Sequence, residues 1–178
     1  HTIFRSAVVF GPGDHFTTGL AGLLATSPYF FPLPGSTRSV IQPLWVEDLV
    51  TVMMWALDDE ATINRTYEIG GSEYFTVRQI LEILMPILHA RRYLVELPLP
   101  LLRSITVFLE SFVPKFPASS FWIDYASISR TCPADSTSRA FGLMPARFTY
   151  RLDYPAYKPW WRCLSAAYAA RREASLAR

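Results

Sequence analysis

The chain has 178 residues, which is enough for one ordinary domain and too few for two. Hydrophobic residues make up 51% of it and charged residues 18%, a composition that excludes intrinsic disorder. Seventeen basic and fifteen acidic residues leave a net charge of +2, so we expect no nucleic-acid partner. Two cysteines, Cys132 and Cys163, are too few for a disulfide scaffold and lack metal-site spacing, which favours a reduced, cytoplasmic protein.

The first residue, His1, runs directly into an apolar stretch that resembles neither a natural start nor a signal peptide. We therefore expect this chain to begin inside a larger protein. The most apolar run, 97–113, is interrupted by prolines and charged residues, so no membrane-spanning helix is predicted.

The first predicted elements alternate between strand and helix. Residues 3–10 are apolar and β-branched and stop at Gly11-Pro12-Gly13-Asp14, which predicts a buried strand. Thr17 or Thr18 is expected to cap a short helix. The segment 29–35 is punctuated by prolines, so a loop is predicted there.

A helix is predicted over 46–57, after an extended segment at 40–45. Its first turn carries two acidic residues, which suit the positive end of the helix dipole. Apolar residues repeat at three and four and form one face, which comprises Val46, Leu49, Val50, Met53, Met54 and Leu57.

A second strand is predicted over 65–70, and a clear helix start follows it. Thr76 and Gln79 have the spacing of a capping box, and the apolar repeat continues to Leu88. A short strand is predicted at 93–97. Helices are then expected at 99–113, 121–130, 133–141 and 160–177, with a loop at 148–157.

The last 21 residues, 158–178, carry five basic residues and one acidic residue, a net charge of +4. With two tryptophans at its head, this segment is suited to peripheral contact with an anionic membrane surface. A solvated terminal helix explains the same pattern, and we favour that interpretation.

Neither glycine-rich segment is suited to binding a phosphate. Gly11-Pro12-Gly13 follows a strand but lacks the third glycine of a dinucleotide fingerprint, and Asp14 places a negative charge where phosphate would lie. Gly70-Gly71 is followed closely by Glu73. The pair Tyr154 and Lys158 has the spacing of a dehydrogenase catalytic pair. Because Pro155 and Pro159 interrupt any helix there, we interpret this spacing as coincidence.

Three stretches resemble extended short-chain dehydrogenases/reductases, the NAD-dependent epimerase/dehydratase family. They are the strand and turn Ile3-Phe4-Arg5-Ser6-Ala7-Val8-Val9-Phe10-Gly11-Pro12-Gly13-Asp14, the strand-to-helix junction Pro43-Leu44-Trp45-Val46-Glu47-Asp48-Leu49-Val50, and the strand before a capped helix, Thr66-Tyr67-Glu68-Ile69-Gly70-Gly71-Ser72-Glu73-Tyr74-Phe75-Thr76. Their order and spacing cover about residues 3–97. The chain is most similar to the atypical branch that includes a complex I subunit.

The resemblance implies an α/β fold comprising the C-terminal strands of a partial Rossmann-like parallel sheet, with a mainly helical substrate-side subdomain. Residues 1–97 would belong to the C-terminal part of the NAD(P)-binding fold, and residues 98–178 would form a helical extension. The family's phosphate loop and catalytic Tyr-x-x-x-Lys pair lie upstream of the first matching stretch. The parent would bind NAD or NADP, and no cofactor is expected to bind tightly to this chain.

The resemblance also assigns candidate site residues. Ser6, Ala7 and Val8 would line the nicotinamide end of the cofactor site, although Ser6 replaces the family's usual proline. The substrate would be faced by His15, Phe16, Arg38 and Gln42, and Arg38 is equally well explained as an ordinary surface arginine.

Two functions therefore remain open. The chain is either the substrate-side, C-terminal portion of an NAD(P)-dependent epimerase, dehydratase or reductase, not competent alone, or a non-catalytic interaction module of a membrane-associated complex. Its expected partners are the missing N-terminal half and, through the exposed edge of strand 3–10, a second copy of itself.

Overall fold

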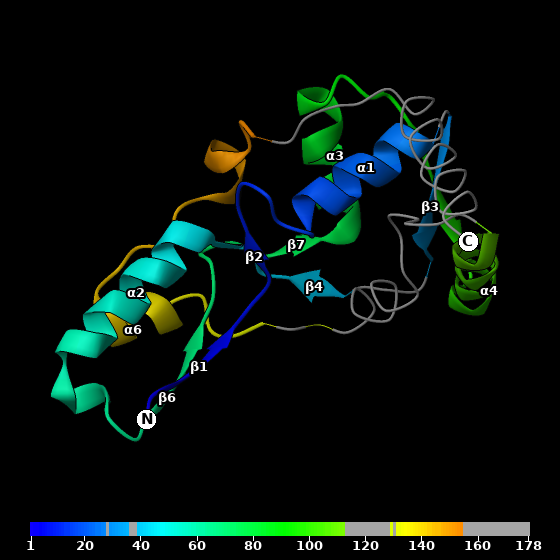
Figure 1. Cartoon of the computed structure of the whole chain (residues 1–178). Helices are drawn as coiled ribbons and strands as arrows, with labels where there is room; N and C mark the ends of the chain where they lie inside the picture. Colours follow the sequence, from blue (N-terminus) through cyan, green and yellow to red (C-terminus); the bar gives the residue numbers. More distant parts are fainter. Residues whose placement is uncertain (28, 36–38, 113–128, 130, 155–178) are drawn as a thin grey trace, which may run out of the picture.

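We describe a computed structural model of the chain over residues 1–27, 29–35, 39–112, 129 and 131–154. Strands and helices alternate along it (Figure 1). The strands are β1 (Ile3–Ser6), β2 (Val9–Phe10), β3 (Phe30–Pro34), β4 (Val40–Ile41), β5 (Leu44–Trp45), β6 (Thr66–Ile69), β7 (Phe75–Thr76) and β8 (Tyr93–Leu97). The helices are α1 (Thr17–Thr26), α2 (Val46–Asp58), α3 (Val77–Ile87), α4 (Leu99–Phe112) and α6 (Ser136–Phe141), with the 3₁₀ turns η1 (Glu60–Thr62) and η2 (Phe148–Arg151).

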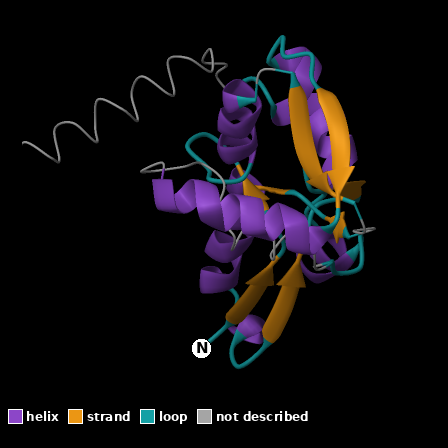
Figure 2. Cartoon of the chain, turned by 90° about the vertical axis from the view of Figure 1, so that its right-hand side faces the viewer, coloured by secondary structure: helices purple, strands orange, loops and turns teal. Residues whose placement is uncertain are grey.

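Three of the four strand pairs are parallel. These are β1–β6, β2–β5 and β3–β8, whereas β4 and β7 pair antiparallel. Figure 2 shows that β1–β6 lies near the N-terminus and that the longer β3–β8 pair lies at the other end of the molecule. The predicted α/β class with parallel strands is therefore confirmed.

Two apolar clusters hold the described elements together. The larger lies around α1, α3 and β2 and includes Phe10, Leu24, Leu81 and Phe148. The smaller lies beneath α2 and α6, where Leu44, Val52 and Ile69 are buried. Since Phe148 belongs to the larger cluster, the described residues 131–154 pack into the same body as residues 1–97, and the division expected at residue 97 remains a prediction.

The strand predicted at 3–10 is buried only in its second half. Val8 is 6% exposed and Phe10 is fully buried, whereas Ile3 is 44% exposed. The expectation of a buried strand is thus wrong for β1. The reason is that β1 has a single strand neighbour, β6, among the described residues.

The loop predicted at 29–35 is instead strand β3. Its Gly35 N–H donates to the Leu97 carbonyl of β8, and the Tyr93 N–H donates to the Tyr29 carbonyl, so the odd-numbered residues bond to β8. Pro32 and Pro34 fall at even positions, whose missing N–H groups face away from that neighbour. The prolines are therefore compatible with an edge strand.

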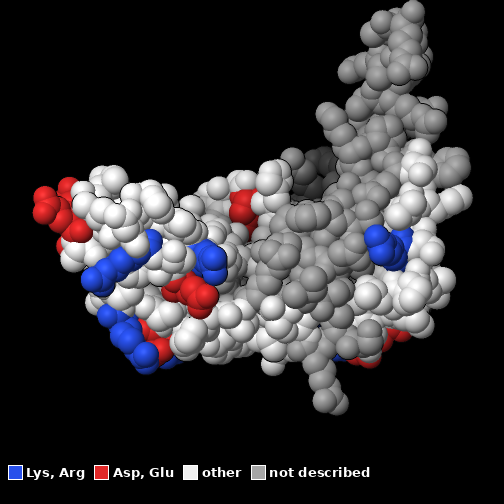
Figure 3. Space-filling model, turned by 90° about the horizontal axis from the view of Figure 1, so that it is seen from below, with Lys and Arg blue, Asp and Glu red and all other residues white. Residues whose placement is uncertain are grey.

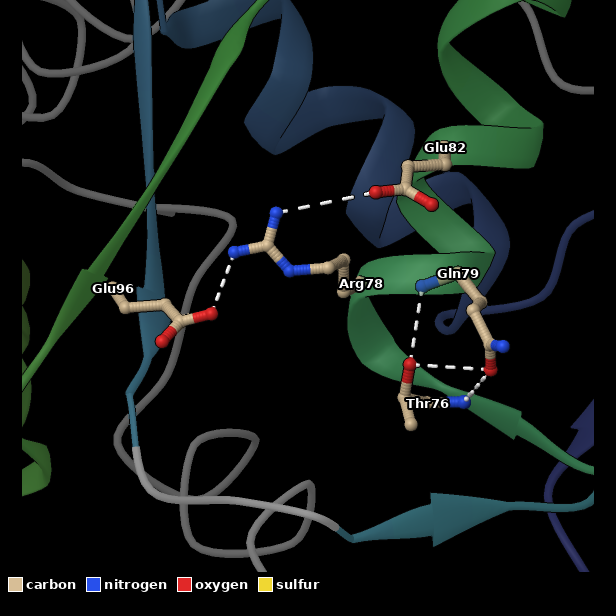
Figure 4. Close-up of polar contacts among 5 residues, drawn as sticks. All are labelled: Thr76, Arg78, Gln79, Glu82 and Glu96. Atoms are coloured by element: carbon tan, nitrogen blue, oxygen red, sulfur yellow. Dashed lines mark hydrogen bonds and ion pairs between the residues drawn. The ribbon is translucent and has the colours of Figure 1, made fainter.

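The capping prediction is wrong for α1 and confirmed for α3. In α1 the helix-start donors are held by Asp14 rather than by Thr17 or Thr18. In α3, the Gln79 N–H donates to Thr76 Oγ1, and the Thr76 N–H donates to Gln79 Oε1 at 2.8 Å (Figure 4).

Figure 4 also shows how α3 is connected to β8. Arg78 of α3 reaches Glu96 of β8 at 2.6 Å and lies 3.9 Å from Glu82 on its own helix. All three side chains are partly exposed, so this ion pair contributes little to stability.

The helix predicted at 46–57 is confirmed as α2, but the face that it buries differs from its apolar face. Val52 and Ala56 are buried beneath it. Much of the predicted face is exposed, including Val50, Met53, Met54 and Leu57. Within the described residues, no helix combines the length and apolar character needed to cross a bilayer.

Candidate functional site

The candidate site lies where the chain leaves β1 and changes its strand neighbour. The Ala7 N–H donates to the Ile69 carbonyl at the end of β6, at 2.8 Å. The next residue, Val8, accepts from the Leu44 N–H at the start of β5, also at 2.8 Å. Adjacent strand residues point their hydrogen-bonding groups to opposite edges. The chain therefore passes from β6 on one edge to β5 on the other at residues 7 and 8.

Such a switch point is where ligands bind in open α/β sheets, outside the carboxyl ends of the strands. Ser6, Ala7 and Val8, the residues proposed for the cofactor, lie at this point. Ser6 is exposed, Ala7 is half-buried and Val8 is buried. Only Ser6 and Ala7 therefore have side-chain surface available to a ligand.

The floor of the site is a close contact between two backbone segments. A Cβ added at Gly71 would lie 1.8 Å from the Pro43 carbonyl oxygen, and one at Gly70 would lie 2.6 Å from the Gln42 side chain. The pair Gly70-Gly71 is thus explained by packing rather than by phosphate binding. Thr137 of α6 fixes the same segment by donating to the Gly70 carbonyl and accepting from its N–H.

Gln42 is fully buried in this floor. Its Nε2 donates to the Gly71 carbonyl at 2.7 Å, and its Oε1 accepts from the Cys132 N–H at 2.9 Å. Both ends of the amide are therefore occupied by protein atoms. The geometry makes Gln42 a residue that positions the floor rather than one that contacts a substrate.

The other substrate candidates are not gathered at one point. Phe16 is 9% exposed and belongs to the larger apolar cluster. His15, beside it, is exposed in the turn before α1. Arg38 lies outside the described residues.

The starts of α1, α2 and α3 already hold acceptors from this chain. Asp14 accepts from the N–H groups of Thr17 and Thr18, at 3.0 and 2.9 Å. Glu47 and Asp48 occupy the first turn of α2, and the capping box fills that of α3. A dinucleotide needs a helix start with free N–H groups for its pyrophosphate. The described residues therefore do not fit the phosphate part of NAD or NADP.

Tyr154 is held away from the chemistry of a catalytic tyrosine. Its hydroxyl lies 2.7 Å from Thr17 Oγ1 and 3.5 Å from Asp14 Oδ2. Burial, followed by the nearby Asp14 charge, raises the pKa of Tyr154 well above its usual value. A dehydrogenase tyrosine needs a lowered pKa, so this agrees with the interpretation of the Tyr154–Lys158 spacing as coincidence; Lys158 lies outside the described residues.

Two carboxylates missed by the sequence analysis anchor a late segment of the chain. Asp48 Oδ2 accepts from the Ala146 N–H at 2.7 Å, and Glu73 Oε2 accepts from the Phe148 N–H at 3.1 Å. These partners are 98 and 75 residues apart. No spacing in the sequence signals such pairs.

Charges of both signs intermingle on the left of the face shown in Figure 3. Within the described ranges, no three His, Cys, Asp or Glu side chains are grouped so as to hold a metal ion. The candidate site is accordingly a neutral switch point with a rigid floor, rather than a charged or metal centre.

Comparisons with known proteins agree with this architecture. The chain is 29% identical over 117 residues to the Arabidopsis thaliana protein named NADH dehydrogenase [ubiquinone] 1 alpha subcomplex subunit 9, mitochondrial. The match covers 65% of this chain and 29% of that protein, a distant homology. No protein-family model matches the chain.

Solved structures of epimerases and dehydratases have the same fold. An epimerase from Methanothermobacter thermautotrophicus has a TM-score of 0.59 at 16% identity, with 97% of this chain and 45% of that chain covered. UDP-glucose 4-epimerase from Thermotoga maritima, solved with UDP-glucose, has a TM-score of 0.55 at 17% identity, with 86% and 44% covered. For dTDP-glucose 4,6-dehydratase from Bacillus anthracis, in complex with NAD, the TM-score is 0.56 at 16% identity, with 85% and 42% covered.

The chain thus has the NAD-dependent epimerase/dehydratase, or extended short-chain dehydrogenase/reductase, fold over less than half of those structures. It spans less than a third of the length of the Arabidopsis protein.

Proposed function

We propose that this chain is the substrate-side, C-terminal portion of an NAD(P)-dependent epimerase, dehydratase or reductase, and that it is not catalytically competent alone. The observation that carries the proposal is the switch point at Ala7 and Val8, which is a ligand position, combined with described helix starts that already hold their own acceptors. Half of a dinucleotide site fits this geometry, and the phosphate-binding half does not.

In this proposal Ser6 and Ala7 border the nicotinamide end of NAD or NADP, and Val8 supports them from the core. His15 faces the substrate from the turn before α1. NAD enters the proposal because the Bacillus anthracis dehydratase was solved with it. The phosphates, and the acid–base groups for hydride transfer, would come from polypeptide outside these 178 residues.

The test uses the tagged chain purified from its source cells together with whatever polypeptide completes it, titrated with NADH and NADPH. We expect saturable binding of one cofactor, weakened about tenfold or more (about 1.4 kcal/mol) by Ser6→Trp. The control is Ala61→Trp, since Ala61 is exposed in η1 at the opposite end of β1 and should leave the affinity unchanged. Absence of saturable binding, or equal weakening by both variants, would contradict the proposal.

A second candidate is a non-catalytic interaction module that keeps the same fold. It is favoured by the match to a protein whose name places it among the subunits of NADH dehydrogenase. Peripheral membrane contact through the basic segment 158–178, which lies outside the described residues, belongs to this candidate. It predicts that the purified assembly contains further subunits and binds neither NADH nor NADPH.

A further inference from the structure

The most apolar face of α2 is not the face that it buries. Successive helix residues are turned by about 100°, which places buried Val52 and Ala56 on one side. The apolar stripe, which we define as Val50, Met53, Met54 and Leu57, is centred about 100° or more away from them. Its members are between 45% and 79% exposed.

Single exposed apolar residues are ordinary on a protein surface, but an ordered stripe is not. The four residues recur at intervals of three and four, the spacing of a helix face that packs against another element. Within the described part of the chain, no element covers them. The stripe therefore has the character of a docking surface.

The free edge of β1 belongs to the same layer as this stripe. Ile3 and Ala7 donate their N–H groups toward β6, so Phe4 and Ser6 point theirs to the opposite edge. Among the described residues that edge of β1 has no strand neighbour. The core beneath α2 includes Phe4, so helix and strand are parts of one packed unit (Figure 1).

Charge distinguishes between possible occupants. From 46 to 63 the chain carries five acidic residues and no Lys or Arg: Glu47, Asp48, Asp58, Asp59 and Glu60. A second copy packed antiparallel through the stripe would bring the acidic start of one α2 against the acidic end of the other. Like charges oppose that pairing, whereas an occupant with a basic rim is attracted.

We propose that the stripe and the free edge of β1 together dock an α/β segment from outside these 178 residues. It adds a strand beside β1 and lays against α2 a helix with an apolar face and a Lys- or Arg-bearing rim. Its size is comparable to this chain, because the solved structures with this fold are about twice as long. The inference rests on the proposed function only in that the same segment would carry the rest of the cofactor site.

Photo-cross-linking in the source cells tests the helix contact. p-Benzoylphenylalanine is placed at Met53, and the control position is Trp55, which is 46% exposed but turned about 200° away on the same helix. We expect Met53 cross-links at least about tenfold more abundant than the control. They should map at intervals of three or four onto a helix flanked by basic residues, outside this chain. Cross-links to 46–60 of a second copy, to an unrelated segment, or at the control level would overturn the proposal.

Hydrogen exchange of the same assembly tests the strand contact. The amides of Phe4 and Ser6 should exchange at least about tenfold more slowly than in the isolated chain. Thr66 and Glu68, whose amides point to the outer edge of β6, are the matched controls and should be unchanged. Equal exchange of Phe4 and Ser6 in both samples would overturn the strand part of the docking.

Cofactor titration of the assembly separates this inference from the proposed function. Docking at Met53 without NADH or NADPH binding would contradict the proposed function and leave the docking surface supported. Cofactor binding without the Met53 cross-link would have the opposite meaning.

Discussion

Asp14 joins two segments that are 140 residues apart in the chain. Its carboxylate accepts from Thr17 and Thr18 at the start of α1, while Thr17 Oγ1 lies 2.7 Å from the Tyr154 hydroxyl. Thr17 is fully buried, so this small network fixes the turn after β2 against the end of the described chain. Local sequence identified the turn but not its distant partner.

Replacement of Tyr154 by Phe should change how stability depends on pH. Folding raises the pKa of Tyr154, mainly by burial, so at high pH the folded state keeps a proton that the unfolded state loses. The contribution is complete below about pH 10, the ordinary tyrosine pKa, and is lost as the pH rises above it. Urea denaturation between pH 8 and 11 should therefore show a shallower decline of unfolding free energy in Tyr154→Phe than in the wild type.

At pH 8 the same variant should lose about 1 kcal/mol through the missing hydroxyl contact. Tyr150→Phe is the matched control, because Tyr150 is 76% exposed and should change neither the slope nor the stability. Parallel pH profiles for Tyr154→Phe and the wild type would contradict the prediction.

At the scale of single elements, the sequence predicted helices better than it predicted strands. The bounds of α2 and the capping box of α3 depend on residues within one or two turns, which a local pattern contains. Strand β3 depends on its pairing with β8, about 60 residues away, and on prolines whose missing N–H groups face outward. Its composition alone favoured a loop.

The glycine pair between β6 and β7 gives an element-level prediction. Gly71→Ala should destabilise the protein by about 3 kcal/mol, because its Cβ would lie 1.8 Å from the Pro43 carbonyl oxygen and both backbones must move. Gly19→Ala in α1 is the matched control. Nothing lies within 4 Å of its added Cβ, and alanine should stabilise the helix by about 0.5 kcal/mol.

Thermal unfolding followed by circular dichroism measures both glycine variants. A Gly71→Ala protein as stable as Gly19→Ala would show that the Gln42–Pro43 segment does not constrain this position.

For the candidate site, the sequence located the position better than the roles of its residues. Ser6 and Ala7 lie at the switch point, as the resemblance implied, but their contact with a cofactor stays a prediction. Gln42 and Phe16 lie in the same region of sequence but are buried, since tertiary packing uses their side chains in the floor and the core. A pattern of residue types cannot distinguish a buried amide from one that faces a ligand.

At the scale of the whole molecule, a late segment completes the core formed by early strands. Phe148 is 1% exposed and packs against Phe10 and Phe75, with ring centroids 4.9 and 5.5 Å apart. Asp48 and Glu73 bind the backbone of the same segment. Residues 144–154 are therefore integral to the folded unit.

Removal of one ring should expose this dependence. Phe148→Ala should lower the unfolding free energy by about 3–5 kcal/mol, the usual cost of deleting a buried aromatic side chain. Tyr150→Ala, two residues away and largely exposed, should change it by less than about 0.5 kcal/mol. Urea denaturation of both variants tests this, and equal effects would show that the segment does not close the core.

The sequence by itself determined the α/β class, the positions of α2, α3 and β6, and the unsuitability of both glycine-rich segments for phosphate. These properties follow from helix periodicity, capping chemistry and charge, which act over a few residues. Only the tertiary structure decided that β3 is a strand, that Gln42 supports a floor and that the apolar stripe of α2 faces outward. Each of these depends on segments brought together from distant parts of the chain, or on the lack of a neighbour among the described residues, and local sequence contains neither.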